Sequence, residues 1–500
     1  MTRLSELIGP ECDLTSDVDA QTIDIQALEL DSREIGPGHL FAAMPGTAFD
    51  GARFIPAAID AGAAAILCAR SADVQPTHVP IIRADDPRRA IAMMASRFYP
   101  RQPETIVAVT GTSGKSSVAD FVRQIFSTLG HRAASVGTIG IVRPDGSVYG
   151  GLTTPDPITL HRTLQELADE GVTHLAFEAS SHGLDQRRLD GVRIKAAAFT
   201  NLGRDHLDYH PTVQAYLDAK LRLFDVLLPE AGTGVVFLGD DGAQPGGPEQ
   251  PPADKVVEVL KTRGIRTLTV GTNSVCDLPY ETTGRSPILQ RLTFTTPDLA
   301  TVEVALPLLG SYQAENATVA AALAIAVGAP PTEALVTLNT LTGVSGRLEL
   351  IGTANGAPVL VDYAHKPDAL ETVLKNLRQS TSGRLISVFG CGGDRDKGKR
   401  PMMGEISTRL ADITIVTDDN PRSEDPAAVR RDILDAAPGA KEIGDRAEAI
   451  RDAVAMAAPG DVVVIAGKGH ETGQIVGDEV RPFSDQDVAR AAIAEFDRND

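Results

Sequence analysis

The chain has 500 residues, of which 42% are hydrophobic and 23% charged, and its formal net charge is -20 at pH 7. This composition is typical of a globular protein, and the length is that of about three domains. The excess of 67 acidic over 47 basic residues excludes nonspecific nucleic-acid binding, which requires a basic face. Because the chain has no run of about 18 apolar residues and no signal-peptide core, we expect a cytoplasmic protein that does not bind membranes.

Residues 1–104 predict a small α/β domain with a short apolar strand at 40–43 and a helical pattern from Phe54 to Ala65. The triplet Asp31-Ser32-Arg33 follows an apolar stretch, and taken alone it is more typical of a turn than of a ligand site. The four cysteines of the whole chain lie far apart and form no CxxC pair, so we expect free thiols.

An apolar strand at 105–109 runs into a glycine-rich loop, and apolar residues three or four apart then predict a helix. The loop residues are Gly111, Thr112, Ser113, Gly114, Lys115, Ser116 and Ser117. This order predicts a phosphate-binding loop, in which backbone N–H groups surround an anion, Lys115 reaches the outer phosphates and the Ser116 hydroxyl faces Mg2+. The alternative is an ordinary tight turn, but the lysine and the hydroxyl stand where the P-loop pattern needs them.

Two further strands of the middle section end on polar residues. The strand at 173–177 is followed by Glu178, and the strand at 195–200 by Asn201 and, a little later, by His206. Because ligands of open α/β sheets bind at the carboxyl ends of parallel strands, we expect these side chains near the phosphate loop. Glu178 is a candidate Mg2+ ligand, whereas His206 is equally a ligand or a core histidine.

Lys220 lies in line with the apolar stripe of a predicted helix at 212–228, four residues from both Tyr216 and Phe224. We therefore expect it to be partly buried. One hypothesis is a stem whose ammonium reaches water, and the other is a desolvated, chemically reactive amine. Further along, the proline- and glycine-rich segment 242–252 predicts a surface loop, and the middle section is expected to end near Gly343.

The last section again alternates strands and helices. Predicted strands at 385–389, 413–417 and 462–466 each end in polar or glycine-rich residues, which predicts a Rossmann-like domain with its own ligand edge. The loop after the first of them is not a GxGxxG fingerprint, so we do not predict an NAD site. Four cations lie between Arg395 and Arg400 in an acidic chain, and we favour an anion site over a merely solvated charge run.

Eight motifs in chain order together carry a resemblance to one family. They are Asp31-Ser32-Arg33, the phosphate loop, Thr153-Thr154-Pro155-Asp156, Glu178-Ala179-Ser180-Ser181-His182-Gly183-Leu184, Asn201 with Asp205-His206-Leu207-Asp208, Asp362-Tyr363-Ala364-His365-Lys366-Pro367, Gly393-Asp394-Arg395-Asp396-Lys397-Gly398-Lys399-Arg400 and Gly467-Lys468-Gly469-His470-Glu471. The chain resembles the Mur ligases of bacterial cell-wall synthesis, most closely the MurE branch. The resemblance implies an α/β fold of three domains: a UDP-sugar-binding domain at 1–104, a central P-loop ATPase domain at 105–343 and a C-terminal Rossmann-like, amino-acid-binding domain at 344–500.

The resemblance also implies a role for each site residue. UDP-N-acetylmuramoyl-peptide would be held by Leu30, Ser32, Thr47, Thr153, Thr154, Ser180, Gln186 and Arg188. ATP would be held by the loop residues Gly111 to Ser117 together with Asn316, Arg347 and Asp362. Mg2+ would be bound by Ser116, Glu178, His206 and a carbamylated Lys220, and the catalytic residues would be Lys115, Lys220, His206 and Glu178. meso-Diaminopimelate would be held by Arg395, Asp419, Asn420, Pro421, Arg422, Gly467 and Glu471.

The implied activity is that of a monomeric, ATP-dependent ligase that adds meso-2,6-diaminopimelate to UDP-N-acetylmuramoyl-L-alanyl-D-glutamate through an acyl phosphate. Arginine at the end of Asp419-Asn420-Pro421-Arg422 is similar to the mark of family members that add diaminopimelate rather than L-lysine, because a guanidinium can hold the distal carboxylate that lysine lacks. The alternatives are an L-lysine-adding ligase of the same branch, a folylpolyglutamate synthetase and a nucleotide-binding regulator. Ser113 and the pair Ser116-Ser117 depart from the asparagine and threonines common in the family, but the hydroxyl for Mg2+ is kept.

Overall fold

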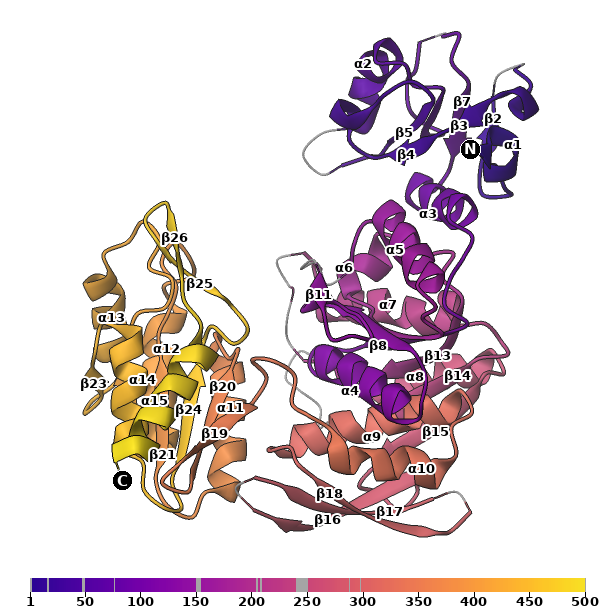
Figure 1. Cartoon of the computed structure of the whole chain (residues 1–500). Helices are drawn as coiled ribbons and strands as arrows, with labels where there is room; N and C mark the ends of the chain where they lie inside the picture. Colours follow the sequence, from indigo (N-terminus) through magenta and orange to yellow (C-terminus); the bar gives the residue numbers. More distant parts are fainter. Residues whose placement is uncertain are drawn as a thin grey trace. The chain divides into compact units, whose positions relative to one another are not determined.

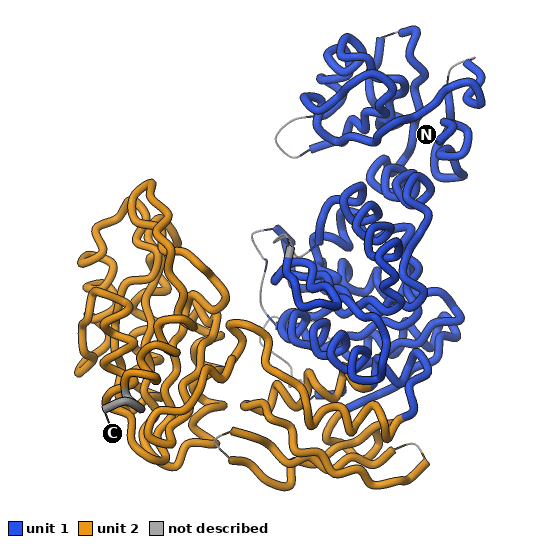
Figure 2. The backbone as a smooth tube through the Cα atoms, in the orientation of Figure 1, with its two compact units in different colours: residues 1–270, 322–330 blue, residues 271–321, 331–500 orange. Residues whose placement is uncertain are grey.

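The computed structural model describes residues 2–15, 18–46, 50–75, 77–149, 154–203, 206, 209–239, 251–286, 288–296 and 298–499. The chain forms two compact units, residues 1–270 with 322–330 and residues 271–321 with 331–500 (Figures 1 and 2). Both units are mixed α/β, as predicted. The finer division at residues 104 and 343 stays a prediction, and most of the predicted loop at 242–252 lies outside the described residues.

The N-terminal part of the first unit is built on a five-stranded sheet of order β2-β7-β6-β5-β4, in which β4 to β7 run parallel. Its elements are β1 (Thr2–Arg3), α1 (Leu4–Leu7), β2 (Asp13–Leu14), η1 (Ala20–Thr22), β3 (Asp24–Ile25), β4 (Ala27–Glu29), η2 (Ser32–Glu34), β5 (His39–Ala43), η3 (Gly51–Phe54), α2 (Ile55–Asp60), β6 (Ala65–Ala69), β7 (Ile81–Ala84) and α3 (Pro87–Phe98). The strand at 40–43 is confirmed as β5. The helix predicted at 54–65 was too long, because Gly62 takes a left-handed φ of 100° and Ala65 already belongs to β6.

The centre of the first unit is a sheet whose strands follow the order β11-β10-β9-β12-β8-β13-β14-β15. The elements are β8 (Thr105–Thr110), α4 (Lys115–Thr128), β9 (Ala133–Gly137), β10 (Gly140–Val142), β11 (Val148–Tyr149), α5 (Pro157–Asp169), β12 (His174–Glu178), α6 (Ser181–Asp185), β13 (Ile194–Phe199), α7 (Val213–Arg222), the π-helical turn η4 (Leu223–Leu227), β14 (Thr233–Phe237), α8 (Pro252–Thr262) and β15 (Arg266–Gly271). β8 pairs in parallel with β12 and β13, and Glu178 lies opposite Val109. The polar residues that end these strands therefore meet at one edge of the sheet, as predicted.

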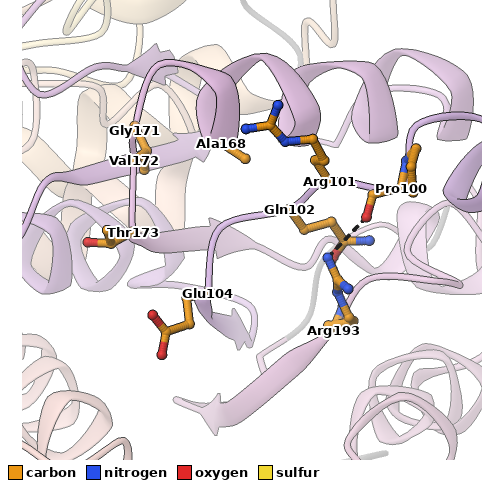
Figure 3. Close-up of a pocket in the computed structure, with 9 residues that line it drawn as sticks. All are labelled: Pro100, Arg101, Gln102, Glu104, Ala168, Gly171, Val172, Thr173 and Arg193. Carbon is orange, nitrogen blue, oxygen red and sulfur yellow. Dashed lines mark hydrogen bonds between the residues drawn. The ribbon is translucent and has the colours of Figure 1, made fainter.

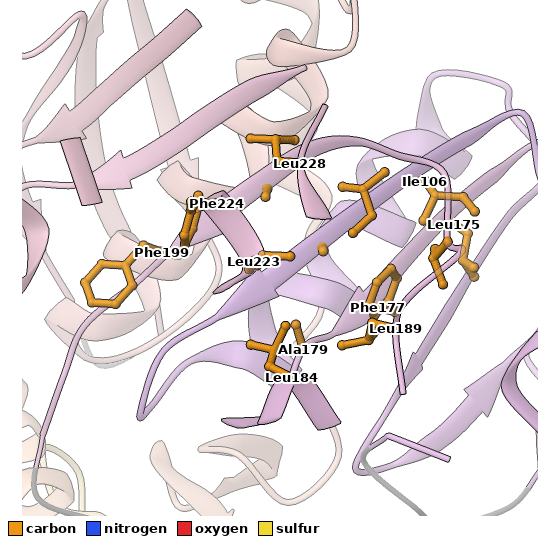
Figure 4. Packing of buried hydrophobic residues seen from close by; sticks show 14 of the residues in the cluster. Ile106, Leu175, Phe177, Ala179, Leu184, Leu189, Phe199, Leu223, Phe224 and Leu228 are labelled. Atoms are coloured by element: carbon orange, nitrogen blue, oxygen red, sulfur yellow. The ribbon is translucent and has the colours of Figure 1, made fainter. Parts of the chain in front are cut away.

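One continuous apolar core fixes these strands (Figure 4). Ile106, Leu175 and Phe199 from three neighbouring strands pack with Leu223 and Phe224 of η4. Helix α4 packs against β8, β9 and β12. Burial of a leucine or phenylalanine side chain stabilises the fold by about 1.5–3 kcal/mol. The core thus holds in register the strands whose carboxyl ends carry the candidate site.

The second unit contains an antiparallel meander of β16 to β18 and a six-stranded sheet of order β19-β20-β24-β21-β22-β23, parallel from β20 to β23. Its elements are β16 (Leu278–Arg285), β17 (Gln290–Thr295), β18 (Thr301–Leu306), α9 (Ser311–Ala326), α10 (Pro331–Val336), η5 (Thr337–Thr340), β19 (Glu349–Ala354), β20 (Ala357–Asp362), α11 (Pro367–Ser380), β21 (Leu385–Phe389), α12 (Lys399–Leu410), β22 (Ile413–Val416), α13 (Pro426–Leu434), β23 (Lys441–Glu442), α14 (Arg446–Ala455), β24 (Val462–Ala466), β25 (Gly473–Val476), β26 (Glu479–Pro482) and α15 (Asp485–Asn499). The predicted strands at 385–389 and 462–466 are confirmed with unchanged bounds, and the strand at 413–417 is confirmed one residue shorter as β22.

The four cysteines are free thiols, as expected from the sequence. Cys12, Cys68, Cys276 and Cys391 are buried free thiols. None of the described helices combines the length and the apolar character needed to cross a membrane.

Candidate functional site

The glycine-rich loop after β8 has the geometry that a phosphate-binding loop requires. Gly114 takes a left-handed φ of 88° directly before α4 begins at Lys115. At Gly111 a Cβ atom would lie 1.9 Å from the Thr200 hydroxyl, so only glycine fits there. The Lys115 ammonium folds over the loop and donates to the carbonyls of Gly111 at 2.9 Å and of Thr112 at 2.8 Å. The helix N-terminus and a cation therefore lie together at this edge, which favours an anion over an ordinary turn.

Asn201, at the end of β13, supports the loop. Its side-chain Oδ1 accepts from the Ser113 N–H at 2.9 Å, and its carbonyl accepts from the Thr112 N–H at 2.9 Å. The Thr200 hydroxyl donates to the Ser113 carbonyl at 2.8 Å. The end of β13 thus fixes the backbone of the loop.

Glu178, at the end of β12, is a buried carboxylate with a defined orientation. It is 2% exposed. Its Oε1 accepts from the Thr138 N–H at 2.7 Å, and its Oε2 accepts from the Thr138 hydroxyl at 3.1 Å. The preceding Gly137 gives the carboxylate room, because a Cβ there would lie 2.1 Å from Oε1. Two hydrogen bonds from Thr138 thus fix the Glu178 carboxylate at the carboxyl end of β12.

Lys220 is 1% exposed, so its predicted burial is confirmed and the hypothesis of an ammonium that reaches water is wrong. It lies on α7, and its Nζ donates to the Gly111 carbonyl at 2.7 Å. The same Nζ lies 4.3 Å from the centre of the Tyr216 ring, one turn earlier on the helix, which is a cation–π contact. The Tyr216 hydroxyl in turn lies 3.2 Å from Thr112 Oγ1. Lys220 is thus fixed against the phosphate loop.

His206 lies in a group of aromatic rings beside α7. Its ring centre is 5.0 Å from that of His182 and 5.9 Å from that of Tyr216. Tyr209 and His210 also belong to this group. His206 has a left-handed φ of 54°, which a non-glycine residue adopts only where its surroundings enforce it. The structure therefore brings His206 to the Tyr216 and Lys220 side of the site, and its role as a ligand stays a prediction.

The residues at this edge fit a Mg2+ ion that is shared with a nucleotide. Mg2+ prefers oxygen ligands and is commonly held by one or two carboxylates together with phosphates and water. Glu178 and the Ser116 hydroxyl are such donors, whereas the described residues form no cluster of three or more His, Cys, Asp and Glu side chains that would hold an ion alone. These donors are compatible with a Mg2+ ion whose remaining ligands are phosphate oxygens and water.

Four residues predicted to hold the UDP-linked peptide form one hydrogen-bonded group next to Glu178. Thr154 Oγ1 lies 2.9 Å from Ser180 Oγ and donates to the Glu178 carbonyl at 3.2 Å. Arg188 donates to the Thr154 carbonyl at 2.5 Å and to Gln186 Oε1 at 2.7 Å. The segment before α5 and the residues on and around α6 thus contribute to one hydrogen-bonded polar group.

The other residues predicted for this substrate belong to the N-terminal part of the first unit. Ser32 lies in the turn η2, which is closed by the Asp31 carboxylate accepting from the Arg33 N–H at 2.9 Å, so the expectation of a turn at this triplet is confirmed. Leu30 directly precedes that turn. Thr47 and Thr153 lie outside the described residues.

In the second unit, Asp362 organises the residues predicted to bind the rest of ATP. It ends β20, is buried, and accepts from the N–H groups of Leu348 and Ala364, each at 2.8 Å. Burial raises the pKa of Asp362, and the nearby Arg347 opposes that effect. The Arg347 guanidinium lies 4.9 Å from the centre of the Tyr363 ring. Asn316 on α9 donates to Gln313 Oε1 at 3.3 Å, and Gln313 donates to the Arg347 carbonyl at 3.2 Å. The three predicted residues are therefore connected.

The ends of β22 and β24 bring together the residues predicted to hold diaminopimelate. Asn420 donates to Glu471 Oε2 at 2.9 Å, and the buried Lys468 donates to Asn420 Oδ1 at 2.9 Å and to Glu471 at 3.0 Å. Asp419 is also buried, which raises its pKa, and a Cβ on Gly467 would lie 2.6 Å from its Oδ2. Pro421 and Arg422 follow directly in the same loop. Within the described residues Arg422 has no carboxylate partner, and its NH1 donates to the Gly393 carbonyl at 2.9 Å.

The four cations of the basic run at 395–400 differ in their exposure and in their partners. Arg400 is fully buried and pairs with Glu424 and Asp432, each at 2.8 Å, so it stabilises the fold and is not a cation of an anion site. Lys397 also pairs with Glu424 at 3.1 Å, and Lys399 donates to the His365 carbonyl at 2.8 Å. The exposed Arg395 stays the predicted ligand residue.

A cavity of about 430 Å³ lies away from all of these residues (Figure 3). It is lined by the linker Pro100–Glu104, the turn before β12 and Arg193, which precedes β13. These segments mark the amino ends of the strands, whereas the phosphate loop follows the carboxyl end of β8. Because ligands of such sheets bind at the carboxyl ends of the strands, the candidate site lies at the opposite edge from this cavity.

Three residues of the site were not predicted from the sequence. Thr138 is a polar residue that follows a strand ending in a glycine. Glu178 and Asn201 were predicted because they too are polar residues at the ends of strands. Tyr216 lies one turn before Lys220, so its contact with the ammonium follows from helix spacing. Lys468 lies inside the last motif, but only the structure shows that it is buried between Asn420 and Glu471.

The fold and these two ligand edges define a P-loop α/β protein with a Rossmann-like C-terminal sheet. Three family models match the chain: the Mur ligase family catalytic domain at 24–99, the Mur ligase middle domain at 109–324 and the Mur ligase glutamate ligase domain at 346–469. The chain belongs to the Mur ligase family.

Relatives and a solved structure agree with that assignment. The UDP-N-acetylmuramoyl-L-alanyl-D-glutamate--2,6-diaminopimelate ligase of Agrobacterium fabrum is 53% identical over 95% of this chain and 94% of its own. The ligase of the same name from Bradyrhizobium diazoefficiens is 52% identical over 98% of this chain and 99% of its own. A solved structure of a ligase of that name has a TM-score of 0.74 and 31% identity, and covers 99% of both chains.

Proposed function

We propose that this protein is an ATP-dependent ligase that joins meso-2,6-diaminopimelate to UDP-N-acetylmuramoyl-L-alanyl-D-glutamate in peptidoglycan precursor synthesis. The observation that carries this proposal is the similarity, over nearly the whole chain, to ligases of that printed name. The phosphate loop, the Glu178 carboxylate and the Arg422 guanidinium supply the groups that the reaction needs. We place the activity in the cytoplasm, where ATP and the UDP-linked precursor are available.

The reaction transfers the terminal phosphate of ATP to the side-chain carboxylate of the D-glutamate residue, which gives an acyl phosphate and ADP. The amine of diaminopimelate then attacks the acyl carbon, the C–N bond forms, and phosphate leaves with the loss of a proton from the amine. Lys115 and the N–H groups of the loop hold the phosphates and offset their charge. Glu178 and Ser116 would hold a Mg2+ ion, which would supply positive charge for the phosphate oxygens. Thr154, Ser180, Gln186 and Arg188 orient the UDP-linked peptide.

We include carbamylation of Lys220 in the proposal. The neutral form of a buried lysine amine adds CO2 and releases a proton, which gives a carbamate with one negative charge. Lys220 is buried and directed at the Gly111 carbonyl of the phosphate loop, where a carboxylate would serve as a further Mg2+ ligand together with His206. An extra mass of one carboxyl group on Lys220 is the expected result of intact-protein mass spectrometry without acid.

Arg422 is the residue that selects the amino acid. Diaminopimelate has a distal carboxylate that L-lysine lacks, and a guanidinium can hold it through two parallel hydrogen bonds. Arg395, Gly467 and Glu471 hold the other end. We expect Arg422→Ala to lower kcat/KM for diaminopimelate by about 10^3-fold or more, because a site built for a polar group discriminates on that scale. The kcat/KM for L-lysine should change little, and equal losses for both amino acids would contradict the assignment.

Release of phosphate with each substrate omitted in turn tests the function as a whole. We expect phosphate only when ATP, Mg2+, the UDP-linked dipeptide and diaminopimelate are all present. A nucleotide-binding regulator would bind ATP without forming an amide. A folylpolyglutamate synthetase would release phosphate with a folate and glutamate, and either result would contradict the proposal.

A further inference from the structure

Two loops that end neighbouring strands of the second unit are locked together around Arg422. Residues 390–395 follow β21 and residues 417–424 follow β22, and the two strands are paired in parallel. The loop backbones touch, since a Cβ on Gly393 would lie 1.9 Å from the Pro421 carbonyl oxygen. The Gly393 N–H donates to the Asn420 carbonyl at 2.9 Å. The position of one loop therefore determines the position of the other.

Two carboxylates close this contact from opposite sides. Asp394, in the first loop, accepts from the Ser423 N–H at 3.0 Å and from the Ser423 hydroxyl at 2.7 Å. Glu424, in the second loop, accepts from the Asp394 N–H at 2.7 Å and is anchored by the buried Arg400 at 2.8 Å. Hydrogen bonds from Arg400 and from the Asp394 N–H lower the pKa of Glu424 to about 2, and the Ser423 N–H and hydroxyl lower the pKa of Asp394. Both groups therefore stay ionised at neutral pH.

The hydrogen bonds that join these two loops form a lock. This lock holds Arg422 in a backbone conformation that an arginine seldom adopts. Asp394 and Arg422 have left-handed φ angles of 53° and 51°. The Arg422 N–H donates to the Ile475 carbonyl at 3.1 Å, and its own carbonyl accepts from the Gly477 N–H at 2.7 Å. Its guanidinium reaches back across the lock to the Gly393 carbonyl at 2.9 Å. The backbone and one end of the side chain are thus fixed. Among the described residues no carboxylate forms an ion pair with the guanidinium, although its charge helps to lower the pKa of Asp394.

We propose that Asp394 and Glu424 are positioning residues that hold Arg422 in the orientation needed to bind the distal carboxylate of the amino-acid substrate. The inference rests on the proposed function, because it concerns the same substrate. Neither carboxylate contacts that substrate in this account. They act on specificity through Arg422, and loss of the lock should weaken selection for a second carboxylate while leaving the ATP and UDP-peptide sites intact.

Asp394→Gly is the most direct variant, because it removes the carboxylate and glycine adopts the left-handed backbone without strain. We expect the KM for diaminopimelate to rise about 10- to 100-fold, as for a group displaced by about 1 Å, with less than about 2-fold change in the KM values for ATP and the UDP-linked dipeptide. The kcat/KM ratio of diaminopimelate to L-lysine should fall by the same factor. Asp396→Gly is the matched control, and it should retain the wild-type KM values. Asp396 is an exposed aspartate of the same run, and within the part of the chain that the structure describes it accepts a hydrogen bond from the Gly398 N–H alone.

A double variant separates positioning from a general loss of structure. In an Arg422→Ala background, Asp394→Gly should change the KM for diaminopimelate by less than about 2-fold, because the residue through which it acts is gone. An undiminished further loss would overturn the inference, since Asp394 would then act by another route. If Asp394→Gly does not fold, Ser423→Ala removes one hydrogen bond of the lock and should raise the same KM several-fold, with recovery in Ser423→Thr.

The outcomes distinguish this inference from the function on which it rests. A wild-type protein that forms no amide with diaminopimelate would overturn both. An active wild type combined with an unchanged KM for diaminopimelate in Asp394→Gly would overturn the positioning role alone. Equal rises in all three KM values would also contradict it, because they would indicate a structural effect on the whole chain.

Discussion

Three buried cations illustrate how single residues divide between structure and chemistry. Lys220, Lys468 and Arg400 are each at most 1% exposed in a chain of net charge -20. A buried charge costs several kcal/mol unless it is paired. Lys468 lies 3.0 Å from Glu471 and Arg400 lies 2.8 Å from Glu424, so carboxylates account for both. The Nζ of Lys220 donates to the Gly111 carbonyl of the phosphate loop and contacts the Tyr216 ring.

We expect Lys220→Ala to lower kcat by about 100-fold or more, on the scale of losing one group that stabilises charge in the transition state. If the carbamate is the active form, short carboxylic acids should restore part of the activity by occupying the space of the missing group. Lys220→Arg keeps a cation but cannot be carbamylated, and it should stay inactive with the same acids. Steady-state rates with and without formate or acetate provide the measurement, and a fully active Lys220→Ala would contradict the role.

At the scale of elements, α5 carries a histidine that makes the first unit sensitive to acid. His161 is buried, its Nε2 lies 2.9 Å from the Asp190 carbonyl, and burial lowers its pKa to about 4. The unfolded chain has a histidine pKa near 6.5, so the folded state binds fewer protons between pH 6.5 and 4. Stability is therefore complete above pH 6.5 and falls as the pH falls through this window, by about 2 kcal/mol between pH 6.5 and 5.

The variant His161→Gln removes this titration and keeps a side-chain donor. Between pH 7 and pH 5, the free energy of unfolding of the wild type should fall by about 2 kcal/mol more than that of the variant. Urea denaturation of both proteins at the two pH values measures the difference. The same pH dependence in both would show that His161 does not contribute.

Helices α14 and α15 are joined by a fully buried ion pair. Arg446 donates to both oxygens of Asp485 at 2.7 Å, and neither side chain is exposed. Removing one partner leaves an uncompensated buried charge, so we expect Asp485→Ala to lower the free energy of unfolding of the second unit by about 3–5 kcal/mol. Asp487→Ala breaks an exposed pair with Arg490 on the same helix and should cost less than about 1 kcal/mol. Comparable losses in the two variants would contradict this account.

Local patterns in the sequence predicted the elements better than the contacts between them. Strands β21 and β24 have the predicted bounds because each is a short apolar run bounded by glycine or polar residues, and Lys220 is buried because its helix spacing places it on the apolar stripe. The burial of Arg400 depends on Glu424, 24 residues later, and the orientation of Glu178 depends on Thr138, 40 residues earlier. Neither contact has a local signature, and so both required the structure.

At the scale of the whole molecule, the residues proposed for the three substrates are divided between the two compact units. The phosphate loop and the Thr154 to Arg188 group belong to the first, whereas Asp362, Arg422 and Glu471 belong to the second. An assay of nucleotide binding alone thus tests only part of the proposed function. An assay of amide formation tests all of it, and identifying the amino acid that is added tests the role of Arg422.

The most direct test is therefore a competition in one reaction. The protein is given ATP, Mg2+, the UDP-linked dipeptide and equal concentrations of meso-diaminopimelate and L-lysine, and the products are identified by mass spectrometry. The account predicts that the diaminopimelate product exceeds the lysine product by about 10^3-fold or more, together with one ADP and one phosphate for each amide. Equal amounts of the two products, or ATP hydrolysis without either, would contradict it.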